Sequence, residues 1–65
     1  MTTLYNFLLE LQSFWDISED DLEKAKTSNI TNTNNTTFYN IIKEYQSGYY
    51  DNDAPILVQR VLALL

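Results

Sequence analysis

Residues 38–49 read FYNIIKEYQSGY and contain the most regular helical pattern of the chain. Apolar side chains recur there at the spacing i, i+3, i+4, i+7 and i+11, which places them on one face of a helix. They are Phe38, Ile41, Ile42, Tyr45 and Tyr49. The pattern predicts a helix over 38–47 whose apolar face packs into a core.

The sequence after this helix predicts a turn and a further amphipathic helix. Gly48 stands where a glycine in left-handed conformation often ends a helix, and residues 50–53 are typical of a turn. Pro55 suits the first position of the next helix, because its missing N–H needs no partner there. We expect this last helix over 55–64, and a buried strand over 56–58 is the alternative.

The sequence before residue 38 predicts a polar loop. Residues 27–37 read TSNITNTNNTT, and such side chains bond their own backbone and favour turns over helix interiors. We expect a mobile loop over about 28–36, with a short edge strand over 30–33 as the alternative. Three Asn-x-Thr sequons begin at Asn29, Asn34 and Asn35, and we interpret them as part of this linker.

The strongest local signal for a helix start is the segment from Ile17 to Leu22. Ser18 is a good N-cap, and the three acidic residues after it match the helix dipole. Ile17 and Leu22 occupy the two positions of a hydrophobic staple. The sequence therefore predicts a short helix over 19–26.

The first helix is predicted over residues 3–15. Its apolar residues recur at intervals of three and four on one stripe, and polar residues fall on the opposite side. The stripe consists of Leu4, Phe7, Leu8, Leu11, Phe14 and Trp15.

Together these elements predict one all-α domain over 1–65, a small bundle of three main helices plus one short capped helix. A chain of this length can hold only one domain. The predicted core consists of Leu4, Phe7, Leu8, Leu11, Trp15, Leu22, Phe38, Ile41, Ile42, Tyr45, Leu57, Val61 and Leu64.

The composition excludes most small-enzyme chemistry. The 65 residues are 45% hydrophobic, so the chain should fold. Because it contains no His and no Cys, it cannot build a Ser/His/Asp triad, a cysteine nucleophile or a zinc finger. Paired acids at Asp16 and Asp20, and at Asp51 and Asp53, lack the glycine and glutamate of a calcium loop. We expect no enzymatic activity, no cofactor and no metal.

Charge and hydropathy limit the location and the kind of partner. The formal net charge is -5, and only four residues are basic, so we expect no direct nucleic-acid binding. The N-terminus lacks a basic region typical of a secretory signal, and no apolar run is long enough to span a membrane. We expect a cytoplasmic protein.

More apolar residues are present than one core-facing stripe per helix requires. We expect Tyr5, Leu9, Val58, Leu62 and Leu65 to contact another protein or a second copy of the chain, so that a homo-oligomer is expected. Tyr50 is predicted to point outward beside an acidic turn and to be a further contact residue, because tyrosine is common at interface hot spots.

The leading hypothesis is a small non-enzymatic interaction protein, such as an adaptor, an inhibitor or an immunity-type protein. It would act by occupying a partner's surface through its apolar and aromatic helix faces. The alternative is an acidic mimic that inhibits a nucleic-acid-binding protein, because a compact acidic face can imitate phosphate charge. That face would consist of Asp16, Glu19, Asp20, Asp21 and Glu23.

Residues 38–65 also resemble the middle of the helical immunity proteins that protect bacteriocin producers. The resemblance rests on an amphipathic helix, a short turn and the run APILVQRV from Ala54 to Val61. The helical pattern is similar to that of scaffold heterodimerisation domains as well. These resemblances cover under half of the chain or only its helical pattern, and no residue's role is carried over from them.

Overall fold

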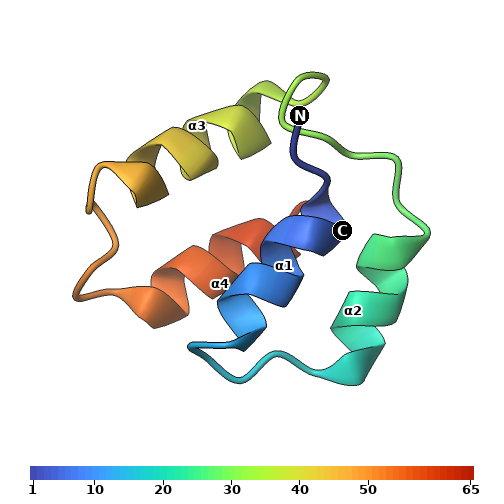
Figure 1. Ribbon diagram of the computed structural model, residues 1–65, viewed down its shortest axis with the longest axis horizontal. Coiled ribbons are helices and arrows are strands. Elements are labelled where there is room, and N and C mark those ends of the chain that lie inside the picture. Colours follow the sequence, from blue (N-terminus) through green and yellow to red (C-terminus); the bar gives the residue numbers. More distant parts are fainter.

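Four helices and no strand make up the computed structural model, which describes all of residues 1–65 (Figure 1). The helices are α1 (Leu4–Gln12), α2 (Glu19–Lys26), α3 (Thr36–Gln46) and α4 (Ala54–Leu62). The all-α prediction is confirmed, and the region expected as a helix or a strand over 56–58 is helical. Because α2 is only one residue shorter than α1 and α4, the division into three main helices and one short helix is supported only roughly.

The helices form a compact globule with a radius of gyration of 10.8 Å. Helix α1 packs against both α2 and α4, and α3 packs against α4. In Figure 1, α1 and α4 therefore lie in the middle, with α2 at one side and α3 at the other. None of the four helices has the length and apolar content that a membrane crossing requires.

Three of the four helices begin at a side-chain cap. Thr3, Ser18 and Asn35 each accept a hydrogen bond from the backbone N–H three residues on, at 3.1, 3.2 and 3.0 Å. The cap at Ser18 confirms the start predicted for α2. Helix α4 begins after Asp53 without a side-chain cap, and Pro55 stands in its first turn. Proline stabilises this start because its ring already has a helical φ angle.

The core is one cluster of thirteen buried hydrophobic residues drawn from all four helices and the segments between them. These residues are Leu4, Phe7, Leu8, Leu11, Ile17, Leu22, Ala25, Phe38, Ile41, Ile42, Tyr50, Leu57 and Val61. Most of them were predicted. The predicted core residues Trp15, Tyr45 and Leu64 instead lie half-buried at the edge of the cluster.

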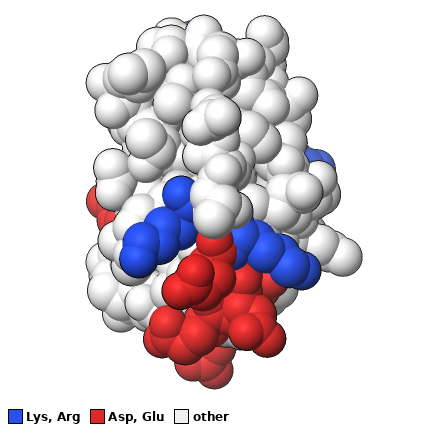
Figure 2. All heavy atoms as spheres, turned by 90° about the vertical axis from the view of Figure 1, so that its right-hand side faces the viewer, with Lys and Arg blue, Asp and Glu red and all other residues white.

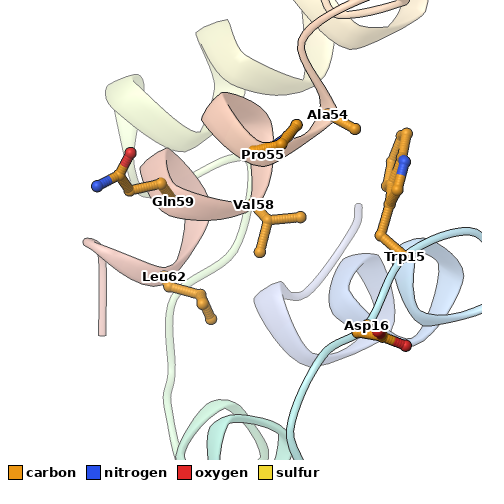
Figure 3. A pocket seen from close by; sticks show the side chains of 7 residues that line it. All are labelled: Trp15, Asp16, Ala54, Pro55, Val58, Gln59 and Leu62. Atoms are coloured by element: carbon orange, nitrogen blue, oxygen red, sulfur yellow. The ribbon is translucent and has the colours of Figure 1, made fainter.

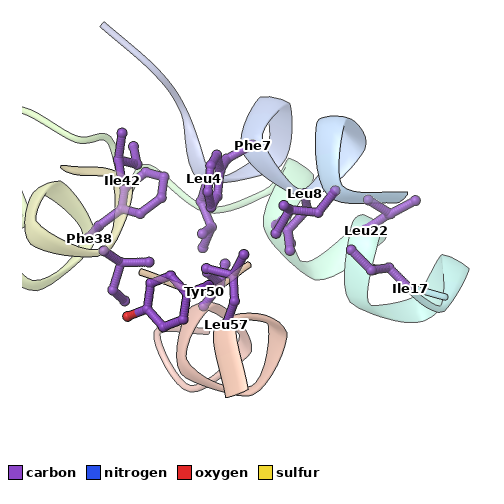
Figure 4. Packing of buried hydrophobic residues seen from close by; sticks show 13 residues of the cluster. Leu4, Phe7, Leu8, Ile17, Leu22, Phe38, Ile42, Tyr50 and Leu57 are labelled. Carbon is purple, nitrogen blue, oxygen red and sulfur yellow. The ribbon is translucent and has the colours of Figure 1, made fainter. Parts of the chain in front are cut away.

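The prediction for the tyrosine pair after α3 is wrong. Tyr50 is 2% exposed and points into the core on the side of α4, whereas Tyr49 is 63% exposed (Figure 4). Gly48 adopts a left-handed φ of 85°, and the N–H of Tyr49 bonds the carbonyl of Glu44 at 3.1 Å. This is the Schellman arrangement that ends a helix. The helical period therefore stops before residue 49, so Tyr49 turns outward and Tyr50 turns inward.

The polar loop between α2 and α3 pairs with the start of the chain. Thr3 and Thr31 form an isolated antiparallel bridge, in which the N–H of Leu4 bonds the carbonyl of Ile30 at 3.0 Å. The side chain of Asn32 accepts a further hydrogen bond, from the N–H of Thr2 at 2.9 Å. Figure 1 shows the N-terminus beside this loop. The alternative of an edge strand over 30–33 thus reduces to a single bridge.

Candidate functional site

An open groove of about 450 Å³ lies between α4 and the segment that follows α1 (Figure 3). We call it the α4 groove. Its lining consists of Trp15 and Asp16 from the connection between α1 and α2, and of Ala54, Pro55, Val58, Gln59 and Leu62 from α4. Figure 3 shows Trp15 on one side of it, opposite the side chains of α4.

The α4 wall of the groove follows from the spacing of apolar residues in that helix. Leu57 and Val61 are fully buried and fix the face that α4 turns to the core. Val58 and Leu62 each stand one residue further on, which rotates them about 100° around the helix. They lie half-buried at the edge of the core. Their stripe, which Ala54 extends, therefore lines the groove and remains accessible.

The opposite wall depends on how the chain leaves α1. The N–H of Trp15 bonds the carbonyl of Leu11 at 2.9 Å, so the helical path continues briefly beyond Gln12. Two residues later the buried side chain of Ile17 anchors the chain. The backbone carbonyl of Ile17 also accepts a hydrogen bond from the side-chain amide of Gln12 at 3.3 Å. Trp15 is held between these two points and faces α4.

An exposed aromatic ring stands next to the groove. Phe14 is 68% exposed, and its ring centroid lies 6.0 Å from that of Trp15. Phe14 was predicted to share the inward stripe of the first helix, but α1 ends at Gln12 and the stripe no longer faces the core there. Together, Phe14 and Trp15 present an aromatic pair at the end of α1.

The residues predicted to bind a partner do not form a single surface. Val58 and Leu62 line the α4 groove. Tyr5 and Leu9 line a smaller hollow of about 210 Å³ between α1 and α2, where Glu19, Glu23 and Lys26 also lie. Leu65 lines a third hollow, beside Lys24 and Ile30. The prediction thus divides into separate sites.

Tyr50 does not point outward as predicted, because its buried side chain links α3 to α4 inside the molecule. Its hydroxyl donates to Oε1 of Glu44 at 3.0 Å and accepts from Nη1 of Arg60 at 3.1 Å. Burial raises the pKa of Tyr50, and the hydrogen bond from Arg60 opposes part of that shift. The same hydrogen bond raises the pKa of Arg60.

The residues predicted to form an acidic face lie just before and within α2. All of them are exposed except Asp21, which is half-buried. Figure 2 shows acidic side chains gathered at one end of the face that α2 occupies, with basic side chains directly beside them. Helix α2 carries three acids in its first turn and Lys24 and Lys26 in its last turn, an order that suits the helix dipole. Nowhere do three or more acidic side chains come together as metal ligands would.

Sequence reasoning missed Trp15 and Pro55 as groove residues. Trp15 was placed in the core because its spacing continued the stripe of the first helix. A usable signal was the stripe of Ala54, Val58 and Leu62. Val58 and Leu62 each follow an inward-facing residue of the last helix by one position.

The side chains that line the α4 groove are mainly apolar, with a few polar groups among them. It offers an indole ring, aliphatic side chains, one carboxylate at Asp16 and one amide at Gln59. Such a set can hold apolar groups and orient them with a few polar contacts. Comparison of the chain with protein-family models, with curated proteins and with solved structures finds no match.

Proposed function

We propose that this chain is a non-enzymatic protein-interaction module that binds another protein through the α4 groove. The observation that carries the proposal is the open apolar groove in which Trp15, Val58 and Leu62 remain accessible. The module would act as an adaptor or inhibitor by occupying the partner's surface.

The aromatic pair at the end of α1 supports this proposal. Tryptophan is among the residues that dominate binding energy at interfaces, where it lies in a well-packed centre surrounded by polar contacts. Here Trp15 lies half-buried on one side of the groove, opposite the apolar side chains of α4, and the exposed residues Asp16 and Gln59 add polar groups to the lining. Phe14 adds an exposed ring that a partner would cover.

Peptide selection tests the proposal without knowledge of the natural partner. Random peptides would be selected on the wild-type protein, and the dissociation constants of the recovered peptides would be measured for two variants. Val58→Gln changes the groove wall, whereas Ile56→Gln changes an exposed apolar residue of α4 outside the groove and is the matched control. We expect Val58→Gln to weaken binding about tenfold or more and Ile56→Gln to change it little. Equal effects of the two variants would contradict the proposal.

The alternative function, an acidic mimic of nucleic acid, rests on the exposed acids at the start of α2. A partner bound in this way would lose affinity when Asp20, Asp21 and Glu23 are replaced by their amides. It would also lose affinity steeply as salt rises from about 50 to about 200 mM, because exposed charges are screened over that range. A partner held by the α4 groove would keep most of its affinity when these three acids are replaced, because none of them lines the groove.

A further inference from the structure

One acidic side chain stands among the mainly apolar residues that line the α4 groove. Asp16 lines it at one side, and Asp53 precedes Ala54, where the α4 wall begins. Both carboxylates are exposed. The chain continues from Asp16 into the acidic first turn of α2.

All four basic side chains lie away from this groove. The Arg60 guanidinium is bonded to Tyr50, and the Lys43 ammonium lies 5.4 Å from the centre of the Tyr39 ring. Lys24 lines the hollow that contains Leu65, and Lys26 lines the hollow that contains Leu9. No basic side chain therefore stands with Asp16 among the residues that line the groove.

We propose that the α4 groove binds a cationic amphipathic helix of a partner protein. The apolar face of that helix would cover Trp15, Val58 and Leu62, and its lysine or arginine side chains would face Asp16 and Asp53. The α4 wall runs from residue 54 to residue 62, about 12 Å at the rise of a helix, which accommodates about two turns of a bound helix. This inference rests on the proposed function and adds the chemistry of the partner.

Charge argues against a second copy of this chain as the occupant. Two identical chains that meet through one groove present the same patch to each other across a two-fold axis. Such an interface would enclose two copies of Asp16 and bring negative charge from both chains into one patch. Like charges placed together oppose association, whereas a cationic segment gains from the same charges.

The single tryptophan of the chain provides a direct test, because Trp15 lines the groove. Three tryptophan-free peptides of about 15 residues, near the length at which isolated helices become stable, would share one leucine-rich face and carry Lys, Gln or Glu on their flanks. Binding would be followed by the emission of Trp15, which moves to shorter wavelengths when the half-exposed indole is covered. The titrations would be done at low and at high salt.

We expect the Lys peptide to bind about tenfold more tightly than the Gln peptide at low salt, since a few exposed ion pairs each change affinity about two- to fivefold. The difference should disappear at high salt, and the Glu peptide should bind weakest. Asp16→Asn should weaken the Lys peptide about two- to fivefold and leave the Gln peptide unchanged. The matched control is Asp51→Asn, which removes the same charge from an exposed turn residue outside the groove and should have little effect.

Two outcomes would overturn the inference, and they are distinguishable. If the Lys and Gln peptides bind equally and both shift the Trp15 emission, the groove binds apolar helices without selecting charge, so the proposed function stands and the inference fails. If the Lys peptide leaves the emission of Trp15 unchanged, the groove does not accept a cationic helix and the inference fails outright.

Discussion

Arg60 on α4 donates a hydrogen bond to the buried hydroxyl of Tyr50, 3.1 Å away, and that hydroxyl in turn donates to Glu44 on α3. The guanidinium carbon also lies 5.9 Å from the centre of the Tyr50 ring. A single side chain from the connection between the two helices thus joins both of them. Through Arg60, in the last turn of α4, it contacts the helix that carries one wall of the groove.

Removal of the Tyr50 ring should destabilise the protein far more than removal of its hydroxyl. We expect Tyr50→Ala to lower the free energy of unfolding by about 3 to 5 kcal/mol, because a large cavity forms in the core. Tyr50→Phe should cost about 1 kcal/mol, since Glu44 and Arg60 can turn to water once the hydroxyl is gone. Denaturant unfolding monitored by circular dichroism measures both values. Similar costs for the two variants would contradict the buried position of the ring.

Stability should fall in alkaline solution as Tyr50 loses its proton. Burial raises the pKa of Tyr50 in the folded chain above the ordinary value of 10.0. The folded state therefore holds the proton more tightly than the unfolded state, and this contribution is complete below about pH 10 and is lost as pH rises through the folded pKa. Tyr45, whose pKa burial also raises, contributes to the same loss.

Variants separate these tyrosines in unfolding experiments between about pH 9 and about pH 11, a range that brackets the ordinary pKa. Tyr50→Phe should reduce the dependence of stability on pH. Tyr45→Phe should reduce it as well, because burial also raises the pKa of Tyr45. An identical alkaline loss in all three proteins would show that Tyr50 does not contribute.

Any side chain at Gly48 should lower the stability of the fold. Its φ of 85° is left-handed, and an added Cβ would lie 3.1 Å from a carboxylate oxygen of Asp51. We expect Gly48→Ala to lower the free energy of unfolding by about 1 to 2 kcal/mol, because alanine resists this conformation. Gly48→Ala combined with Asp51→Ala would remove the close contact but retain the backbone strain. A double variant as stable as the wild type would therefore contradict the strain explanation.

The cap of α2 should contribute measurably to stability. Ser18→Ala removes the side-chain acceptor for the N–H of Asp21, and we expect a loss of about 1 kcal/mol in unfolding free energy. Ser13→Ala is the matched control, because the hydroxyl of Ser13 donates to the carbonyl of Glu10, which also accepts a hydrogen bond from the backbone N–H of Ser13. We expect a smaller effect there. Equal losses would mean that the cap does not stabilise α2.

Self-association remains a prediction from the sequence, and the structure narrows the residues that could carry it. Tyr5, Val58 and Leu62 are half-buried, whereas Leu9 and Leu65 are 39% and 41% exposed and are the most exposed members of the predicted set. If the chain associates through them, Leu9→Gln should lower the mass measured by light scattering, and Val58→Gln should not. A monomeric mass for the wild type across a concentration series would contradict self-association.

The parts of the fold that were predictable depend on local sequence. Ser18 followed by acidic residues specifies a helix start by itself, so α2 begins at the predicted residue. The spacing of Phe38, Ile41 and Ile42 specifies which face of α3 is buried. In each case neighbouring residues contain all of the information.

The errors occur where the helical period ends and tertiary contacts decide. Tyr49 is exposed and Tyr50 is buried, the reverse of the prediction, because the left-handed turn at Gly48 ends the helical period. Trp15 lies in the groove and not in the core because the helix ends before it and the buried side chain of Ile17 anchors the following segment. Such positions depend on the distances between helices, and a single sequence does not specify them.

The most direct test of the account is a nuclear magnetic resonance titration of the isotope-labelled protein with a peptide selected for binding. The account predicts that the largest chemical-shift changes occur at the Trp15 indole and along the stripe of Val58 and Leu62. Changes centred instead on Tyr5 and Leu9, in the hollow between α1 and α2, would contradict the assignment of the α4 groove as the binding surface.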